Sequence, residues 1–320
     1  MEYRKLGRTG LKVAPICLGG NVFGWTADEQ ASFAVLDAYV EAGGNFIDTA
    51  DVYSRWAPGH TGGESELVLG KWFAARGNRD KVVLVTKVGS PMGDAPGQRG
   101  LSRGWIMHAV EQSLRRLQTD YIDVYLSHYD DPDTRPDETM RAYDDLIRAG
   151  KVRYVGASNY SPSRLVGALW ASDRNGYARY ELLQPLYNLA RREAYERELQ
   201  AVCREHELGV ITYSSLASGF FSGKYRSDAP LPESARAGGV QNNYMNARGF
   251  AALDALREVA AGHNATTGQV ALAWILSRPE ITAPIASATT ADQARELAGA
   301  AALRLTSDEV AHLDQVTDWR

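Results

Sequence analysis

The stretch from residue 101 to residue 128 reads LSRGWIMHAVEQSLRRLQTDYIDVYLSH and contains one repeating unit of the expected fold. Ser102 is a favourable helix N-cap, and apolar side chains then recur at positions 106, 110, 114 and 117, along one helix face. A short run rich in Ile, Val and Tyr follows, which is typical of a strand. The stretch therefore predicts a helix over 102–117 that leads into a strand over 122–127.

The same alternation of strand and helix extends through the chain in both directions from this stretch. Strands separated by single helices indicate parallel pairing through right-handed crossovers. Eight such units favour closure into a barrel. The predicted strands are Ile16–Gly19, Asn45–Thr49, Val82–Lys87, Ile122–Ser127, Val152–Ala157, Leu182–Pro185, Val210–Tyr213 and Thr282–Ala286.

The intervening segments carry helix start and stop signals. One predicted helix ends at Gly43–Gly44 and another at Gly150, while Ser161-Pro162 opens a third. The predicted helices are Asp28–Ala42, Gly63–Arg76, Ser102–Leu117, Arg135–Ala149, Ser163–Arg174, Arg191–Glu207, Phe250–Ala261, Thr266–Ser277 and Thr290–Ala301.

Two segments lie outside the repeat. Glu2–Ala14 is predicted to be a hairpin with its turn at Gly7–Gly10, placed to plug the bottom of a barrel, and Leu216–Gly249 is predicted to be a long loop. The alternative fold is a doubly wound sheet with a Gly-rich phosphate turn, but no two glycines stand two residues apart. The expected fold is therefore α/β: one (β/α)8 TIM barrel domain over residues 1–320, with an N-terminal β-hairpin and a long loop on its C-terminal face.

Composition excludes several classes of protein. The 320 residues are 44% hydrophobic and 23% charged, with 35 basic and 39 acidic side chains, so neither dominant disorder nor a nucleic-acid partner is expected. Cys17 and Cys203 stand alone, which favours a reducing compartment. The N-terminus lacks an apolar signal core, and no apolar run approaches the roughly 20 residues of a membrane span. A cytoplasmic protein without membrane contact is the expectation.

Four titratable residues follow consecutive predicted strands on the face where such barrels carry their active sites. Asp48 ends the second strand, Tyr53 lies in the next loop, Lys87 ends the third strand and His128 follows the fourth. Each residue alone has an ordinary structural explanation, as a cap, a solvated strand end or a core side chain. Their placement at one barrel mouth instead predicts a joint catalytic site.

The chemistry of this group fits proton transfer to a carbonyl oxygen. A lysine ammonium beside a phenol is expected to lower the pKa of Tyr53, while Asp48 partners Lys87 and His128 donates a hydrogen bond to the substrate. No side chain supplies hydride, so a nicotinamide or a flavin is implied. A serine hydrolase is disfavoured because G-x-S-x-G is absent, and a metal enzyme because the six histidines show no ligand spacing. GFFSGK at 219–224 has too few residues between its glycines for a phosphate loop.

At these residues the sequence resembles the aldo-keto reductase family over almost its whole length. The motifs are LGRTGLKVAPICLGG at 6–20, GGNFIDTADVYS at 43–54, TK ending at 87, LQTDYIDVYLSH at 117–128, GKVRYVGASNYS at 150–161, LLQPLYNLARR at 182–192, YSSLASGFFSGKY at 213–225 and ATTADQARE at 288–296. The 213–225 motif is most similar to the branch that holds potassium-channel β subunits and many bacterial reductases.

The resemblance implies roles for further residues. It implies Tyr53 as general acid/base and NADP(H) bound directly by the barrel, with NAD(H) as an alternative cofactor. Ser158, Asn159 and Gln184 are expected to hold the nicotinamide carboxamide, and Tyr213 to stack on the ring. The other expected cofactor contacts are Gly20, Asn21, Asp48, Ser214, Leu216, Ser218, Lys224 near phosphate, and Thr289, Gln293 and Glu296 at the adenosine end.

Departures from the family pattern weaken one part of this assignment. Ser215 stands where Pro is common, Ser287 where Gly is common, and Leu297 where Asn is frequent at the adenine end. Either Arg226 or Arg236 is a candidate for the 2′-phosphate of NADP, and the sequence does not decide between them.

The substrate is expected to be a small carbonyl compound or the matching alcohol. Trp25, Trp56, Tyr129 and Tyr187 fall on predicted loops at the catalytic face and suit apolar, aromatic or sugar-like substrates. The alternative function is a cofactor-binding regulatory or interaction subunit with little turnover, against which the intact group of four residues argues. An oligomer is possible but not implied.

Overall fold

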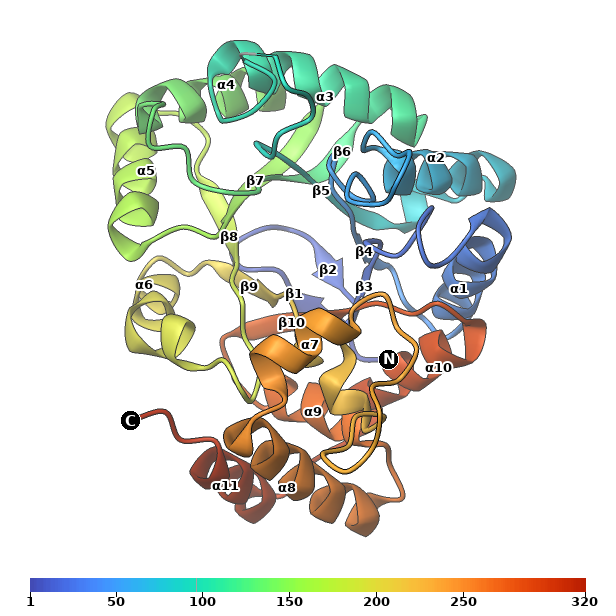
Figure 1. The fold of residues 1–320 in the computed structure, drawn as a ribbon. Coiled ribbons are helices and arrows are strands. Elements are labelled where there is room, and N and C mark those ends of the chain that lie inside the picture. Colours follow the sequence, from blue (N-terminus) through green and yellow to red (C-terminus); the bar gives the residue numbers. More distant parts are fainter. Residues whose placement is uncertain (96) are drawn as a thin grey trace.

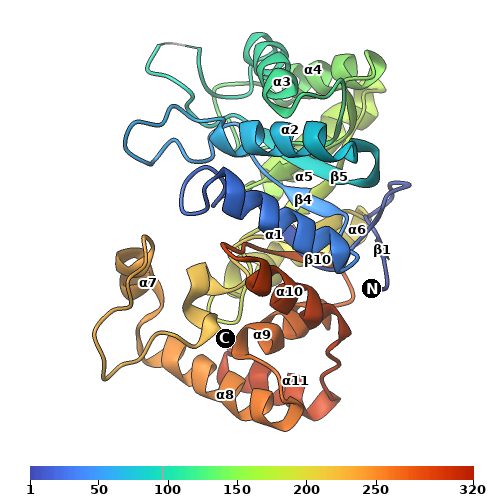
Figure 2. The same cartoon turned by 90° about the vertical axis from the view of Figure 1, so that its right-hand side faces the viewer.

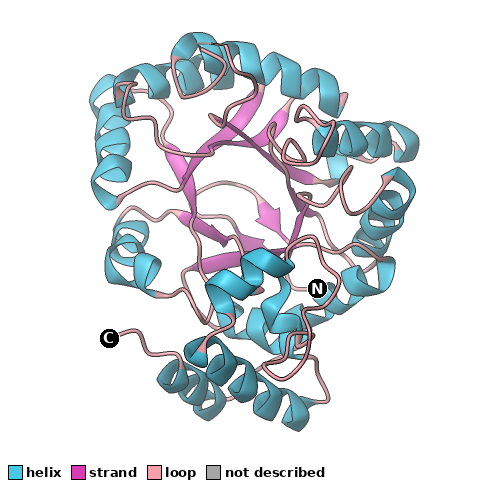
Figure 3. Cartoon of the chain, in the orientation of Figure 1, coloured by secondary structure: helices cyan, strands magenta, loops and turns pink. Residues whose placement is uncertain are grey.

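Eight parallel strands close into a barrel in the computed structural model, which describes residues 1–95 and 97–320 (Figure 1 and Figure 3). Each strand pairs with its neighbour along the chain, and β10 pairs with both β9 and β3 to complete the ring. The predicted fold class is therefore confirmed. The barrel strands are β3 (Cys17–Gly19), β4 (Phe46–Asp48), β5 (Val83–Val88), β6 (Ile122–Ser127), β7 (Val152–Ser158), β8 (Tyr180–Gln184), β9 (Gly209–Thr212) and β10 (Ile281–Ala286).

Helices surround the barrel because each connection between parallel strands must cross back over its outer surface. The side chain of Ser102 accepts a hydrogen bond from Trp105 N at the start of α3, as the sequence predicts. The helices of the barrel wall are α1 (Glu29–Glu41), α2 (Glu64–Arg76), α3 (Arg103–Leu117), α4 (Pro136–Arg148), α5 (Pro162–Asn175), α6 (Gln200–Glu205), α8 (Ala247–His263), α9 (Thr267–Leu276) and α10 (Ala291–Gly299).

The N-terminal hairpin forms as predicted and closes one end of the barrel. Strands β1 (Arg4–Lys5) and β2 (Lys12–Val13) pair antiparallel. Leu6 and Val13 are fully buried and pack with Phe46, Val85 and other barrel-interior side chains in one cluster. Figure 2 shows β1 and α7 (Ala237–Tyr244) at opposite ends of the molecule, so the hairpin leaves the other end of the barrel accessible.

The structure differs from the prediction in three segments. The predicted loop Leu216–Gly249 contains a short helical segment, η3 (Ala217–Ser222), and helix α7. The predicted helix Arg191–Glu207 is a π-helical turn, η2 (Tyr195–Leu199), followed by α6. The C-terminal segment forms the additional helix α11 (Ser307–Val316), which Thr306 and Glu309 begin with a capping box.

Shorter helical turns complete the description. They are η1 (Arg79–Lys81), which precedes β5, and η4 (Ala300–Ala302), which follows α10. Within the described ranges, none of the helices combines the length and the apolar character that crossing a lipid bilayer requires.

Candidate active site

Asp48, Tyr53 and Lys87 meet at the carboxyl ends of β4 and β5. Lys87 Nζ lies 2.7 Å from Asp48 Oδ2 and 2.9 Å from the Tyr53 hydroxyl, and it also donates to the carbonyl of Thr49 at 2.8 Å. The Tyr53 hydroxyl donates a longer bond of 3.3 Å to Asp48 Oδ2. Lys87 and Asp48 are both buried, so this ion pair is shielded from solvent. The structure thus brings together three residues of which the first and the last, Asp48 and Lys87, lie 39 positions apart along the chain.

The electrostatics of this cluster differ from the sequence expectation at Tyr53. Burial, and then the negative charge of Asp48, hold the pKa of the Tyr53 phenol well above its ordinary value. Burial also lowers the pKa of the Lys87 ammonium, although Asp48 opposes this effect. The expected lowering of the Tyr53 pKa by Lys87 is therefore wrong, because desolvation and the adjacent carboxylate outweigh the ammonium. The phenol stays protonated and is suited to act as a proton donor.

His128 completes the group and is held by neighbours on several sides. Its Nδ1 lies 3.1 Å from the Oγ of Ser90, and Tyr129 stacks on its ring with centroids 4.9 Å apart. The ring centroids of His128 and Tyr53 are 6.0 Å apart. Burial, followed by the positive charge of Lys87, keeps the pKa of His128 well below its ordinary value. The imidazole is therefore neutral near neutral pH and available as a hydrogen-bond donor.

Polar side chains at the ends of β7, β8 and β9 form a connected network beside this cluster. Gln184 Nε2 donates to Asp48 Oδ1 at 2.7 Å, and Ser158 Oγ donates to the carbonyl of Gln184 at 2.9 Å. Asn159 Nδ2 donates to the carbonyl of His128, while the Tyr213 hydroxyl donates to Asn159 Oδ1 at 2.7 Å. These bonds fix the ends of the strands relative to one another.

The backbone at this network is strained in two places. Asn159 has a φ of 55° and Ser214 a φ of 56°, in the left-handed region that residues other than glycine seldom adopt. Such conformations persist only where surrounding contacts enforce them, and they concentrate at functional sites.

A cavity of about 250 Å³ opens above these residues. Its floor is formed by Asp48, Tyr53 and His128, and its wall contains Tyr129 and Arg236. Most of the expected nicotinamide and pyrophosphate contacts lie on it. These are Asn21, Ser158, Asn159, Gln184, Tyr213, Ser214, Leu216 and Ser218, with Gly19, Ser215, Gly219, Ile285, Ala286 and Ser287 in addition.

Gly20 does not line the cavity but lies behind it. Its N–H donates to the carbonyl of Asp48 at 2.7 Å, and its own carbonyl accepts a bond from Ser65 Oγ. A Cβ at position 20 would come within 2.9 Å of that Ser65 oxygen. Gly20 therefore supports the position of Asp48 through the backbone.

A second hollow, of about 570 Å³, continues from the first. The two share Leu216, Ser218, Gly219, Arg236 and Ser287, so together they form one elongated cleft. The residues expected at the phosphate and adenosine end all line the second part. They are Lys224, Thr289, Gln293 and Glu296, next to Leu297.

The structure separates the two candidate arginines. Arg226 is exposed and forms a bidentate pair with Asp228, outside both hollows. Arg236 lines both hollows, and its guanidinium lies 5.8 Å from the centre of the Trp25 ring. Among the described residues, no hydrogen-bond acceptor lies within reach of its buried Nη2. Arg236 is therefore the arginine that faces the cleft.

Aromatic side chains lie close to Tyr53, and one of them, Tyr129, lines the cavity. Trp25 and Trp56 form an edge-to-face pair with centroids 5.4 Å apart, and Trp56 lies 6.0 Å from the Tyr53 ring. Trp56 is 50% exposed and Tyr129 is 52% exposed. Tyr187 lies elsewhere, contrary to expectation: it is buried, stacks on Trp274 and donates its hydroxyl hydrogen bond to Glu196.

Sequence reasoning missed Ser90 at this site and left Arg236 undecided. Ser90 follows Lys87 by three residues in the loop after β5, so its place after a strand end was a signal that could have identified it. Arg236 lies in the segment predicted to be a loop, where no periodic pattern indicates which side chains face inward.

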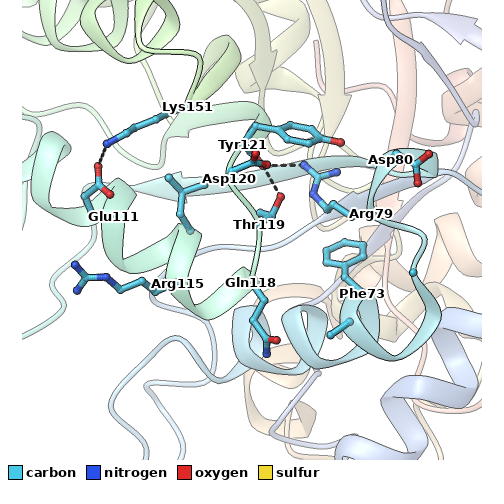
Figure 4. Close-up of a pocket in the computed structure, with 13 residues that line it drawn as sticks. Phe73, Arg79, Asp80, Glu111, Arg115, Gln118, Thr119, Asp120, Tyr121 and Lys151 are labelled. Atoms are coloured by element: carbon cyan, nitrogen blue, oxygen red, sulfur yellow. Dashed lines mark hydrogen bonds and ion pairs between the residues drawn. The ribbon is translucent and has the colours of Figure 1, made fainter.

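A further hollow, of about 890 Å³, lies where η1, the C-terminal part of α3 and the start of β7 meet, near the amino ends of the strands (Figure 4). Two of its basic side chains, Arg79 and Lys151, are engaged in ion pairs. Lys151 pairs with Glu111, and Arg79 donates to the carbonyl of Tyr121 at 3.0 Å and pairs with Asp123 at 2.8 Å. Along residues 1–95 and 97–320, three or more His, Cys, Asp or Glu side chains do not gather into a metal site. The cleft above Tyr53 is therefore the candidate active site.

Comparisons with known proteins agree with this geometry. Residues 15–318 match the model of the aldo/keto reductase family. The uncharacterized oxidoreductase YrpG of Bacillus subtilis is 37% identical, with 99% of this chain and 96% of that protein covered. The versiconal hemiacetal acetate reductase of Aspergillus parasiticus is 32% identical, covering 98% and 96%. A probable voltage-gated potassium channel subunit beta of Arabidopsis thaliana is 33% identical, covering 92% and 90%.

Proposed function

The chain belongs to the aldo/keto reductase family, and we propose that it is an NADP-dependent oxidoreductase that reduces aldehydes or ketones, or oxidises the matching alcohols. One observation carries this proposal. Lys87 Nζ contacts both the Asp48 carboxylate and the Tyr53 hydroxyl. These groups lie at the floor of the first hollow, which joins the second hollow to form one elongated cleft.

Tyr53 is proposed as the general acid for reduction and the general base for alcohol oxidation. Its phenol remains protonated because burial and Asp48 raise its pKa, so it can give a proton to a carbonyl oxygen as negative charge develops there. Lys87 donates to the same phenol oxygen and stabilises the phenolate that remains. His128, which is neutral, donates a hydrogen bond that orients the carbonyl. A nicotinamide, when bound, supplies or accepts the hydride.

The residues along the cleft fit a dinucleotide. The buried Nη2 of Arg236 has no acceptor among the described residues and borders both hollows, as a phosphate ligand would. Thr290 caps the N-terminus of α10, next to Thr289 and Gln293, which places a positive helix end at the second hollow. We propose that Arg236 and Lys224 favour NADP(H) over NAD(H).

The remaining cleft residues divide along its length. Ser158, Asn159 and Gln184 would hold the carboxamide, and Tyr213 would stack on the nicotinamide ring. The other proposed contacts are Asn21, Ser214, Leu216 and Ser218 along the pyrophosphate path, and Thr289, Gln293 and Glu296 at the adenosine end.

The substrate side of the site is proposed to lie among Trp25, Trp56 and Tyr129. Tyr129 lines the cavity, Trp56 contacts the ring of Tyr53 and Trp25 packs on Trp56, and half of the surface of Trp56 and Tyr129 remains exposed. Flat aromatic walls with an open side suit bulky apolar or aromatic carbonyl compounds, and sugars can stack on the same faces.

A regulatory or interaction subunit with little turnover is the second candidate. It is supported by relatives named as probable potassium channel subunits beta. Both candidates predict cofactor binding, so turnover distinguishes them. The cluster of Asp48, Tyr53, Lys87 and His128 favours the enzyme.

The decisive experiment compares Tyr53→Phe with the wild-type protein. Oxidation of NADPH is followed by absorbance over a panel of aldehydes and ketones, and cofactor binding is measured by quenching of tryptophan fluorescence. Tyr53→Phe should bind NADPH normally and lose most of the turnover, whereas the matched control Tyr177→Phe, half-buried and remote from the cleft, should retain it. Unchanged turnover in Tyr53→Phe would refute the assigned acid, and absence of turnover in the wild-type protein with every carbonyl would favour the subunit.

A further inference from the structure

Ser90 and His128 lie side by side at the ends of two adjacent strands. The N–H of His128 donates to the carbonyl of Val88 at 2.8 Å, which fixes the residue after β6 against the end of β5. Ser90 lies two residues further along, is 5% exposed, and places its Oγ 3.1 Å from His128 Nδ1. The backbone bond therefore holds the two side chains in register.

The orientation and charge of the imidazole are also fixed. Tyr129 stacks on the ring of His128, and Tyr53 meets it edge to face. The ring is neutral because of burial and the nearby ammonium of Lys87. A neutral imidazole has one nitrogen that donates and one that accepts a hydrogen bond. The direction of the bond between Ser90 and Nδ1 therefore decides whether the other nitrogen, Nε2, carries the proton.

The partners of Ser90 determine that direction. Within the described part of the chain, His128 Nδ1 is the one hydrogen-bond partner of Ser90 Oγ. If Nδ1–H donated to Ser90, the serine hydroxyl would be a buried donor without an acceptor, which is unfavourable. If the serine donates to Nδ1 instead, both groups are satisfied and the imidazole proton lies on Nε2.

We propose that Ser90 is a positioning residue that holds His128 in the tautomer protonated on Nε2. Its catalytic consequence rests on the proposed function. With the proton on Nε2, His128 donates to the carbonyl oxygen of the substrate. In the other tautomer a lone pair of Nε2 would face that oxygen and repel it.

The tautomer is measured directly by long-range ¹H–¹⁵N NMR on protein labelled with ¹⁵N-histidine. The six histidines give six ring systems, and loss of one set of signals in His128→Gln assigns His128. The wild-type protein should show Nε2 protonated and Nδ1 unprotonated. Ser90→Ala should show a mixture of the two tautomers, and Ser90→Thr, which keeps a hydroxyl, should restore the single form. Protonated Nδ1 in the wild-type protein, or an unchanged tautomer in Ser90→Ala, would overturn the proposal.

Kinetics and a control variant separate positioning from stability. Ser90→Ala should lower kcat/KM for carbonyl reduction by about threefold to tenfold, the factor of one neutral hydrogen bond, with unchanged NADPH affinity. Ser172→Ala removes another buried serine hydroxyl, which donates to the carbonyl of Ala178, and should leave the His128 tautomer unchanged. If NMR shows the expected tautomers but neither the wild-type protein nor any variant reduces a carbonyl, the proposed function is refuted and the role of Ser90 in setting the tautomer still stands.

Discussion

Gln184 donates a hydrogen bond of 2.7 Å from its Nε2 to Oδ1 of Asp48, so the last residue of β8 supports the last residue of β4 on the opposite side of the barrel mouth. The second oxygen of Asp48 accepts from Lys87 and Tyr53. Both carboxylate oxygens are therefore engaged, and the orientation of the Asp48 carboxylate depends on a residue 136 positions away in sequence.

Replacing Gln184 by Leu should weaken both stability and catalysis. The change leaves Asp48 Oδ1 buried without this donor, so the free energy of unfolding should fall by about 1–3 kcal/mol. The carboxylate is then free to rotate away from Lys87, and kcat/KM should fall as well. Denaturant unfolding and carbonyl reduction check the two effects. The exposed Gln315→Leu serves as control, and equal unfolding midpoints for the two variants would contradict the expectation.

The pH dependence of reduction should reflect the raised pKa of Tyr53. Reduction needs the protonated phenol, so kcat/KM should stay level through neutral pH and fall only as pH rises through the elevated pKa. Asp48→Asn removes a charge that raises this pKa, so the alkaline fall should move to lower pH. Profiles of kcat/KM against pH for both proteins check this. An alkaline limb at the same or a higher pH in Asp48→Asn would show that Asp48 does not set the acidity of Tyr53.

The sequence predicted the barrel well because its strands are short apolar runs between capped helices. The predicted bounds of all eight strands agree with the structure to within two residues at every end, and the Ser102 cap is present. Helix α7 was missed because AGGVQNNY, at 237–244, contains two glycines and two asparagines, which disfavour helices in isolation. Packing of Val240 and Tyr244 in the core compensates for that weak propensity.

The positions of the candidate site residues that end a strand could be predicted from the sequence. Properties that depend on burial and packing could not. Asp48 and Lys87 lie at positions that any parallel barrel brings to one face. The pKa direction of Tyr53 was mispredicted because burial cannot be read from spacing alone. Tyr187 was wrongly expected to line the substrate pocket for a similar reason. It lies two residues beyond the predicted strand Leu182–Pro185, but its ring stacks on Trp274.

Asp51→Asn should stabilise the protein increasingly as pH rises. The Asp51 carboxyl is buried with no hydrogen-bond partner among the described residues, and burial followed by Glu66 raises its pKa despite Arg116 and Lys87. The pKa of Asp51 in the folded protein lies above its unfolded value of about 3.9. Its contribution to the free energy of unfolding is therefore fully present only below that unfolded pKa. That contribution is lost as pH rises toward the folded value, by at most about 1.4 kcal/mol per pH unit.

Asparagine does not titrate, so unfolding free energies at about pH 4.5 and pH 7 check this prediction. The difference between Asp51→Asn and the wild-type protein should grow between the two values. Asp133→Asn changes an exposed carboxylate and should show almost no such growth. A difference that stays constant or shrinks with pH would mean that Asp51 is ionised in the folded protein at both values.

Arg236→Ala should weaken NADPH binding far more than Arg226→Ala. Arg236 lines both parts of the cleft, whereas the exposed Arg226 is paired with Asp228. Loss of a hydrogen bond to a charged phosphate costs about 1.5–3 kcal/mol, which corresponds to roughly a tenfold to hundredfold rise in Kd. Fluorescence titration measures both variants. Equal losses of affinity would contradict the assignment of Arg236 to the phosphates.

Gly7→Ala should destabilise the barrel from the end opposite to the active site. Gly7 has a φ of 53°, and a Cβ there would lie 2.4 Å from Gly209 N and 2.7 Å from the carbonyl of Glu181. The contacts are with the backbone at the starts of β8 and β9, so neither a rotamer change nor a small shift relieves them. A left-handed conformation alone costs about 1 kcal/mol or more for alanine, and the overlap adds to it. Gly10→Ala, in the same turn, meets only the Tyr154 hydroxyl at 3.7 Å and should be tolerated. Urea unfolding of the two variants should therefore give a clearly lower midpoint for Gly7→Ala, and matching midpoints would mean that the hairpin can move away from the strands without loss.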